Sequence, residues 1–182
     1  MSTPPDGLRV STERGIVVLR PVDVSKDVPL ITEWMNRPHV AEYWKLDWSS
    51  ARLEEYLVAQ QDADISRPCL GLVGGTPVSY WEIYRPMADP LGQAYPAHED
   101  DLGVHVLIGE ARLTGMGLGT LLLRAVRDGL FGADSGCGRI VAEPDVRNVA
   151  SVRAFIKAGF RRWQDIQLDD KTAALMVAER EA

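Results

Sequence analysis

The 182-residue sequence has few cysteines and no long apolar run, and each shortage excludes a class of protein. Cys69 and Cys137 are too few for a disulfide framework and lack the spacing of metal ligands. Their apolar surroundings predict small core residues rather than nucleophiles. No stretch approaches the roughly 20 apolar residues of a membrane helix, and residues 1–14 lack the apolar centre of a signal peptide. We therefore expect a cytoplasmic protein with no metal and no membrane partner.

An excess of positive charge is also missing. Lysine and arginine number 20 against 26 aspartates and glutamates, which leaves a formal net charge of -6. Binding of nucleic acid needs a basic surface, and the arginines here are scattered along the chain. We therefore expect no nucleic-acid partner. The acidic balance suits a cationic small molecule such as an amine, although it is also common among cytosolic proteins.

The apolar periodicity predicts a single domain over residues 15–182 after a flexible lead at residues 1–14. Apolar and β-branched runs predict strands at 15–19, 68–73, 77–84, 101–108, 139–142, 162–168 and 172–178. Amphipathic spacing predicts helices at 28–35, 39–44, 51–61, 117–131 and 148–158. A proline-bearing polar stretch at 85–100 is expected to be a loop.

The order of these elements predicts one mixed α/β sheet. Gly74 and Gly75 between two apolar runs are typical of a hairpin turn. The second half alternates strands with helices, which demands parallel neighbours and right-handed crossovers. The largely apolar run 101–108 is expected to be a central strand.

A glycine-rich turn opens the helix predicted at 117–131. Gly115, Gly117 and Gly119 let the backbone approach an anion, and a helix N-terminus adds unpaired N–H donors and partial positive charge. A purely structural turn is the alternative. A dinucleotide site fits poorly, because the turn lies past mid-chain, follows antiparallel strands and lacks an acidic strand end about 20 residues later. A nucleoside-triphosphate loop would need Gly-Lys-Ser/Thr, which is absent.

Two motifs carry a resemblance to a known family. Gly115–Thr120 with the leucines that follow resembles the pyrophosphate loop of the GCN5-related N-acetyltransferases (GNAT). The segment from Asn148 to Phe160 resembles the second conserved block of that superfamily. The resemblance spans essentially the whole chain and implies the α/β (α+β) GNAT fold, with about seven strands in a mixed sheet and four or five helices around it. Thr114 stands where many members carry Arg or Gln, with Arg112 close by.

The resemblance implies acyl-CoA, as acetyl-CoA or succinyl-CoA, as the co-substrate. The residues expected to hold it are Leu107, Ile108, Arg112, Gly115, Met116, Gly117, Leu118, Gly119, Thr120, Asn148, Ser151 and Phe155. Asn148 is also a candidate N-cap of the following helix. Phe155 lacks the hydroxyl of the tyrosine that serves as general acid in many members, but a thiolate leaves readily without one.

Further strings narrow the resemblance to one subgroup. Residues 36–40, 43–44, 80–84 and 103–109 are similar to siderophore-biosynthesis acyltransferases, which acylate hydroxylysine, hydroxycadaverine or the lysine side chain of mycobactin-type siderophores. Aminoglycoside 6'-N-acetyltransferases are relatives that place an acidic residue where this chain has His105. The subgroup implies acetyl or succinyl transfer to a hydroxylated diamine or amino acid.

The chemistry of acyl transfer needs a neutral nitrogen nucleophile and a proton acceptor. His105 lies on the strand that leads to the glycine turn, and an imidazole with a pKa of about 6.5 suits a general base. Glu143 or Asp145 is expected to orient it, because both follow the adjacent predicted strand. The alternative for His105 is a structural histidine whose hydrogen bonds are made within the sheet. The alternative for Asp145 is that it begins a turn.

An aromatic group with one carboxylate precedes the glycine turn and suits an apolar stem with a cationic end. The expected substrate-binding residues are His39, Trp44, Tyr80, Trp81, Glu82 and Tyr84. Residues 80, 82 and 84 share one strand face, so only half of the strand residues can line a pocket. Ordinary core packing is the alternative for each, and His39 is also a candidate cap of the helix at 39–44.

Two other functions remain open from the sequence. One is an aminoglycoside or general small-amine N-acetyltransferase, and the other is a catalytically silent module that binds CoA as a sensor. A monomer and a homodimer are equally compatible with the sequence.

Overall fold

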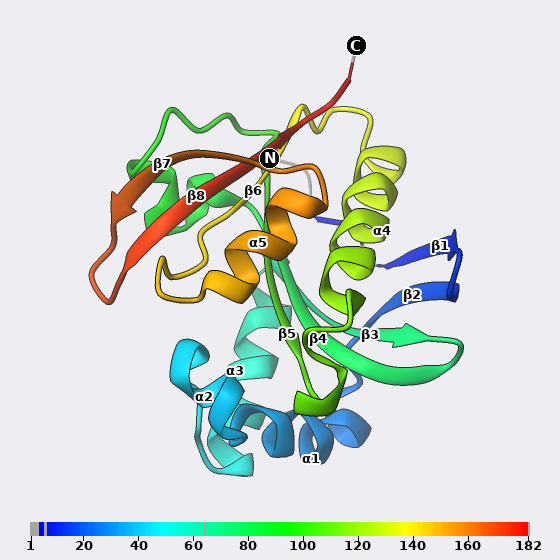
Figure 1. The fold of residues 1–182 in the computed structure, drawn as a ribbon. Helices are drawn as coiled ribbons and strands as arrows, with labels where there is room; N and C mark the ends of the chain where they lie inside the picture. The colour runs from blue at the N-terminus through cyan, green and yellow to red at the C-terminus, as the bar shows by residue number, and fades with distance from the viewer. Residues whose placement is uncertain (1–3, 6, 64, 182) are drawn as a thin grey trace.

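A computed structural model describes residues 4–5, 7–63 and 65–181 (Figure 1). The described residues form one eight-stranded sheet, in the order β1-β2-β3-β4-β5-β6-β8-β7, and five α-helices. The strands are β1 (Leu8–Thr12), β2 (Gly15–Pro21), β3 (Ser66–Val73), β4 (Thr76–Tyr84), β5 (Leu102–Ile108), β6 (Arg139–Ala142), β7 (Arg161–Gln167) and β8 (Thr172–Glu179). The helices are α1 (Val24–Met35), α2 (Pro38–Trp44), α3 (Ser50–Asp62), α4 (Leu118–Ala133) and α5 (Val149–Lys157).

The mixed α/β sheet is confirmed, with one strand more than predicted. Strand β1 lies inside the predicted flexible lead and pairs antiparallel with β2. A short turn makes this hairpin, in which the Thr12 hydroxyl donates to the Gly15 carbonyl at 2.6 Å. Residues 1–3 and 6 of that lead lie outside the described residues. The predicted loop at 85–100 contains short 3-10 turns at 86–88 and 90–93.

The expected parallel neighbours occur at one place. Strands β5 and β6 pair in parallel, as the strand–helix–strand order predicts. Strand β7 is parallel to β6 in direction but does not lie beside it, because β8 pairs antiparallel with both. The short connection between β7 and β8 makes them a hairpin, and β8 takes the free edge of β6.

The two faces of the sheet bury different cores. Helices α4 and α5 cover one face, where Trp81, Ile83 and Val104 lie in the largest apolar cluster (Figure 1). The other face holds two smaller clusters. One lies under α1, α2 and α3 and includes Tyr80 and Leu107, and the other lies over β6 and β8 and includes Tyr84. The seam between these two clusters lies on β4 and β5.

Strands β5 and β6 diverge soon after they meet. Their register consists of two pairs, Leu102 with Ile140 and Gly103 with Val141. Beyond Gly103, β5 has no ladder partner on the β6 side among the described residues. Parallel strands that separate in this way leave an opening between their carboxyl ends, where open α/β sheets bind ligands.

Both cysteines are buried and neither is in a disulfide with a described residue, which agrees with the prediction that they belong to the core. Among the described residues, no helix combines the length and the apolar character that crossing a membrane requires.

Candidate active site

A cleft of about 250 Å³ lies where β5 and β6 diverge. Side chains from three strands and three helices line it, together with the turn that joins β7 to β8. They are Tyr43, Trp44, Leu46, Tyr56, Glu82, Val104, His105, Val106, Ala142, Glu143, Pro144, Asp145, Asn148, Ser151, Phe155, Asp170 and Lys171. The cleft therefore brings the start of the 148–160 segment beside the strand that carries His105, whereas no residue of the glycine turn lines it.

His105 lies between two carboxylates at the seam of the sheet. Its Nδ1 is 3.0 Å from Glu82 Oε2, and its Nε2 is hydrogen-bonded to Glu143 Oε1. Glu82 lies directly opposite His105 in the antiparallel register of β4 and β5. Glu143 follows β6 and reaches His105 across the opening. The His105 side chain is 31% exposed, whereas those of Glu82 and Glu143 are 6% and 5% exposed.

A second ring of polar groups holds the two carboxylates. The hydroxyls of Tyr56 and Tyr80 donate to Glu82 Oε1 at 2.8 and 2.9 Å. The Tyr84 hydroxyl donates to Glu143 Oε2 at 2.8 Å, and Lys171 Nζ lies 3.7 Å from Glu143 Oε1. Buried carboxylates are costly unless they are paired and hydrogen-bonded, and these partners meet that need.

The two carboxylates change the protonation of His105. Burial by itself lowers the pKa of the imidazole, but Glu143 and then Glu82 outweigh burial and raise this pKa to about 10. Burial of Glu143 likewise opposes its ionised form, but His105, Lys171 and the Tyr84 hydroxyl lower the Glu143 pKa to about 2. The two carboxylates therefore favour the imidazolium form of His105 over the neutral form that an imidazole pKa near 6.5 would give.

Of the two acidic residues considered as partners of His105, the structure brings Glu143 to it and not Asp145. The Asp145 carboxylate accepts from the backbone N–H of Arg147 at 2.8 Å and pairs with the Arg147 guanidinium. This is the turn that the sequence analysis gave as the alternative. Asn148 lines the cleft and caps α5, because its Oδ1 accepts from the N–H of Ser151 at 3.1 Å.

The predicted aromatic group separates into two faces. Trp44 lines the cleft with its ring centroid 6.0 Å from that of His105. Tyr80 and Tyr84 are buried beneath the cleft. Their hydroxyls donate to the carboxylates of Glu82 and Glu143, which line it. Trp81 points to the opposite face, where its indole N–H donates to Ser79 Oγ. Its assignment to the substrate is therefore wrong, because neighbouring strand residues alternate in direction.

His39 also differs from its prediction. It neither lines the cleft nor caps α2, whose N-cap is Arg37. Its Nε2 lies 3.0 Å from the carbonyl of Ile108 and so attaches α2 to the end of β5. Leu107, predicted at the acyl-CoA site, turns its side chain into the core under α1 to α3, so only its backbone can face a ligand.

Nine lining residues are not among the predicted site residues, and Tyr43, Tyr56 and Lys171 are three of them. Tyr43 and Tyr56 come from α2 and α3, and Lys171 comes from the turn between β7 and β8. Tyr43 directly precedes the predicted Trp44, so proximity could have indicated it. Nothing in the local sequence distinguishes Tyr56 or Lys171 from surface residues, because their positions depend on how α3 and the hairpin dock.

The glycine turn has the backbone that its sequence predicts. Gly115 and Gly117 have φ values of 73° and 80°, a region that favours glycine, and α4 begins directly after them. The N–H groups of residues 115–120 make no hydrogen bond with any described residue. Successive free N–H groups at a helix N-terminus form a cradle for an anion.

The side chains at this turn differ in burial. Leu118 is buried in the core, whereas Met116 and Arg112 are largely exposed. Arg14, from the β1–β2 turn, donates to the Met116 carbonyl from both terminal nitrogens at 3.2 Å. The sequence analysis missed Arg14 because it placed residues 1–14 outside the fold.

Comparison with known proteins agrees with this geometry. The sequence profile of a family described as an acetyltransferase (GNAT) domain matches residues 23–168. The lysine N-acyltransferase MbtK of Mycobacterium sp. (strain MCS) is 40% identical over 141 residues, 78% of this chain and 58% of that protein. MbtK of Mycobacterium tuberculosis (strain ATCC 25618 / H37Rv) is 33% identical over 176 residues, 97% of this chain and 78% of that protein. The chain thus spans less than two thirds of the first relative.

A third relative and two solved structures extend the comparison. The N-hydroxyputrescine acetyltransferase of Acinetobacter baumannii is 33% identical and covers 90% of this chain and 77% of that protein. An uncharacterized protein from Bacillus halodurans has a TM-score of 0.89 and 32% identity over 98% of this chain and 92% of its own. The aminoglycoside acetyltransferase AAC(6')-Ib in complex with coenzyme A has a TM-score of 0.80 and 28% identity, and the match covers 90% of this chain and 95% of that chain.

Proposed function

This chain belongs to the acetyltransferase (GNAT) family, and from that membership we propose that it transfers an acyl group from acyl-CoA to an N-hydroxylated amine. The acceptor is a hydroxylated diamine or amino acid such as hydroxycadaverine or N6-hydroxylysine, and the reaction serves hydroxamate siderophore biosynthesis. The acyl group is acetyl or succinyl. The observation that carries the proposal is the Glu82–His105–Glu143 cluster in the cleft between β5 and β6.

We assign the acyl donor to the glycine turn and to the cleft that holds this cluster. The free N–H groups of residues 115–120 suit the CoA pyrophosphate. Asn148, Ser151 and Phe155 line the cleft beside β6, where they suit the pantetheine arm. The donor supplies an acyl group activated as a thioester, and this assignment places that thioester near His105.

His105 is the proposed proton acceptor in direct transfer. The nitrogen–carbon bond forms as the carbon–sulfur bond breaks, the proton of the nitrogen passes to His105, and the sulfur leaves as the CoA thiolate. In this role the imidazole must be neutral, with Nδ1–H held by Glu82 and Nε2 turned toward the nitrogen in place of Glu143. The raised pKa of His105 means that this form is reached only at alkaline pH or when the acceptor displaces the Glu143 contact.

The cleft lining favours an amine with an apolar stem. Tyr43, Trp44 and Tyr56 supply aromatic surface, and four carboxylates face or border the same space. A hydroxylamine nitrogen is largely neutral at pH 7 and needs no prior deprotonation, unlike the side chain of lysine. The names of the relatives include both lysine and N-hydroxyputrescine enzymes, which supports an amine of this size as acceptor.

Thiol release tests the proposal. Acetyl-CoA and succinyl-CoA are each offered with hydroxycadaverine, hydroxylysine, lysine and kanamycin, and the hydroxylated amines are expected to give the highest kcat/KM. His105→Ala is expected to lower kcat/KM by about 10² to 10⁴-fold. His98→Ala, an exposed histidine of the loop before β5, is the matched control.

Three outcomes would contradict the proposal in different ways. Near wild-type turnover of His105→Ala at saturating substrate would remove the base assignment. A preference for kanamycin would favour an aminoglycoside acetyltransferase. Binding of CoA without thiol release from any amine would favour a silent sensor.

A further inference from the structure

Lys171 is a cationic side chain of the cleft that the proposed reaction does not use. It lies in the turn between β7 and β8 and lines the cleft together with Asp170. The Lys171 side chain is only 20% exposed, so most of it is buried. Burial of an ammonium is costly unless polar or charged groups surround it, and the contacts of Lys171 therefore indicate what this end of the cleft accepts.

The ammonium of Lys171 has unused hydrogen-bond donors. Its one ion-pair partner among the described residues is Glu143, whose Oε1 lies 3.7 Å from Nζ, which is beyond hydrogen-bond distance. Glu143 Oε1 is already bonded to His105 Nε2, and Glu143 Oε2 accepts from the Tyr84 hydroxyl. An ammonium has three N–H donors, and those of Lys171 meet no acceptor of the described chain at hydrogen-bond distance.

The other carboxylates of the cleft do not supply the missing partner. Four carboxylates line the cleft. Three of them, on Glu82, Glu143 and Asp145, are bonded to tyrosine hydroxyls, to the imidazole or to an arginine. The fourth, on Asp170, is exposed and forms no ion pair with a described residue. The donors of Lys171 are therefore available to a ligand in the cleft.

Backbone contacts fix the turn that carries Lys171 beside the cleft (Figure 1). The N–H of Val146 donates to the Thr172 carbonyl at 3.0 Å, and the N–H of Ala174 donates to the Pro144 carbonyl at 2.9 Å. These bonds join the segment after β6 to the start of β8. The sheet thus holds the backbone of Lys171 in place, and a group that is held in this way loses little further freedom when a ligand binds.

We propose that Lys171 binds a carboxylate of the substrate, which is either the terminal carboxylate of a succinyl group or the carboxylate of hydroxylysine. The proposal rests on the proposed acyl transfer and names the part of the substrate that this end of the cleft recognises. Lys171 and His105 both contact Glu143 Oε1, so a carboxylate at Lys171 lies near the reacting atoms. In both ligands a short aliphatic chain separates the carboxylate from the reacting atom, and the carboxylate accepts charge-assisted hydrogen bonds from the ammonium.

Two matched pairs of substrates test this subsite and distinguish the two sources. Succinyl-CoA has a carboxylate where butyryl-CoA has a methyl group, and hydroxylysine has a carboxylate where hydroxycadaverine has a hydrogen. For each pair, kcat/KM with the carboxylate-bearing member is divided by kcat/KM with the other member. In Lys171→Met this ratio is expected to fall roughly tenfold, mainly through KM, for the pair whose carboxylate Lys171 binds. The pair that responds identifies the source.

Two further variants are the controls. Lys171→Arg keeps a cationic donor at the same position, so it is expected to retain most of the ratio that Lys171→Met loses. Lys26 is a largely exposed residue of α1 that pairs with Asp23 and does not line the cleft. Lys26→Met therefore removes the same charge elsewhere and is expected to keep the wild-type ratios.

A role for Lys171 as no more than a partner of Glu143 predicts a different result. In that case Lys171→Met lowers kcat/KM equally for both members of each pair, and both ratios stay at their wild-type values. Unchanged ratios in both pairs would overturn the subsite. A fall of equal size in Lys26→Met would also overturn it, because the effect would then come from the net charge of the protein.

The same measurements separate the subsite from the proposed function. If amines are acylated while both ratios stay unchanged, the proposed function stands and the subsite fails. If no amine releases thiol, the proposed function fails, and the ratios are measured instead as calorimetric affinities for the same four ligands. A lower affinity ratio in Lys171→Met then supports the carboxylate subsite, and an unchanged ratio in both pairs overturns it.

Discussion

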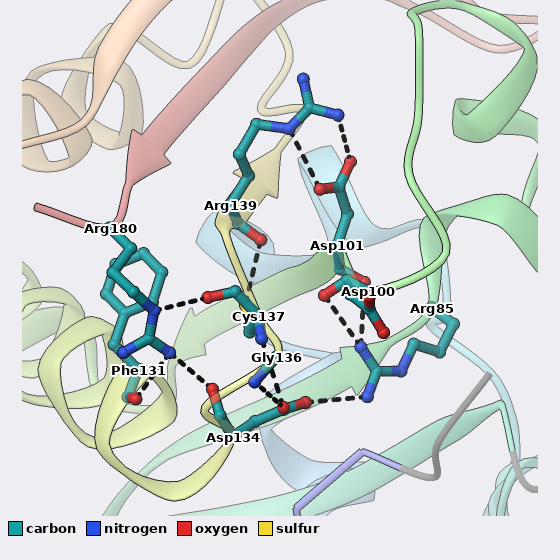
Figure 2. A network of polar contacts seen from close by, with 9 residues as sticks. All are labelled: Arg85, Asp100, Asp101, Phe131, Asp134, Gly136, Cys137, Arg139 and Arg180. Carbon is teal, nitrogen blue, oxygen red and sulfur yellow. Dashed lines mark hydrogen bonds and ion pairs between the residues drawn. The ribbon is translucent and has the colours of Figure 1, made fainter. Parts of the chain in front are cut away.

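The two ends of the β5–β6 pair carry two charged clusters of opposite design. At the end where the strands are joined, Arg85 donates to Asp134 at 2.9 Å and to the carbonyl of Asp101 at 3.3 Å (Figure 2). Arg139 pairs with the Asp101 carboxylate at 2.7 Å. At the end where the strands diverge, His105 lies between two carboxylates in a cleft. One cluster ties elements together, and the other faces a cavity.

At the joined end, hydrogen bonds and ion pairs connect neighbouring elements and leave little of Arg85 exposed. Arg180, just after β8, donates to the carbonyls of Phe131, Asp134 and Cys137, which include the last turn of α4 (Figure 2). The Arg85 side chain is 1% exposed. These groups pair each charge with a partner drawn from another element, so we infer that this cluster holds β5 and β6 together. The His105 cluster has two carboxylates with one imidazolium and the Lys171 ammonium beside them, and it opens onto a cleft that a substrate can enter.

The largest expected effect is on stability and comes from a substitution in the cluster at the joined end. Arg85→Met removes the guanidinium that pairs with Asp134 Oδ2 and donates to the carbonyls of Asp100 and Asp101, so the free energy of unfolding is expected to fall by about 3 to 5 kcal/mol. Urea unfolding followed by circular dichroism measures it. The kcat/KM of the remaining folded protein is expected to stay near the wild-type value. A large loss of activity with normal stability would contradict the division between the two ends.

The next effect concerns the pH dependence of activity and tests the role of His105 at the end where the strands diverge. If His105 accepts the proton, wild-type kcat/KM rises with pH toward a limb near the His105 pKa of about 10. Glu143→Gln removes the carboxylate that contributes most to raising this pKa, so the limb is expected to move to lower pH. The measurement is kcat/KM against pH with a hydroxylated amine. A limb that stays in place would mean that another group titrates.

The smallest expected effect concerns the residues beneath the cluster. Tyr56→Phe removes one of the two hydroxyls that donate to Glu82 Oε1. The activation free energy is expected to rise by about 1 kcal/mol, which is roughly a fivefold loss of kcat/KM. Tyr43→Phe is the control, because Tyr43 lines the same cleft without contacting Glu82. Equal losses in both variants would assign the effect to the aromatic surface rather than to the orientation of Glu82.

Local patterns explain why so much of the fold was predictable. The glycines at 115 and 117 have positive φ values, and β6 occupies 139–142 as its apolar run predicts. These features depend on residues close in the chain. Strand β1 was not predicted, because its alternation of Leu8 and Val10 with polar residues is only five residues long; in the fold it pairs with β2 and packs on α4. The place of β8 beside β6 likewise depends on partners distant in sequence.

The site divides along the same line. The sequence by itself determined the glycine turn, the strand that carries His105 and the position of Glu143 after the next strand, because strand order and turn chemistry are local. Tertiary structure alone decided that Glu82 and Glu143 both reach His105, that Trp81 and Leu107 face away, and that Asp145 binds Arg147. It also brought Arg14 to the cradle from 102 residues away. Protonation follows from these contacts, because the pKa of a buried group depends on charges that only the folded chain brings near it.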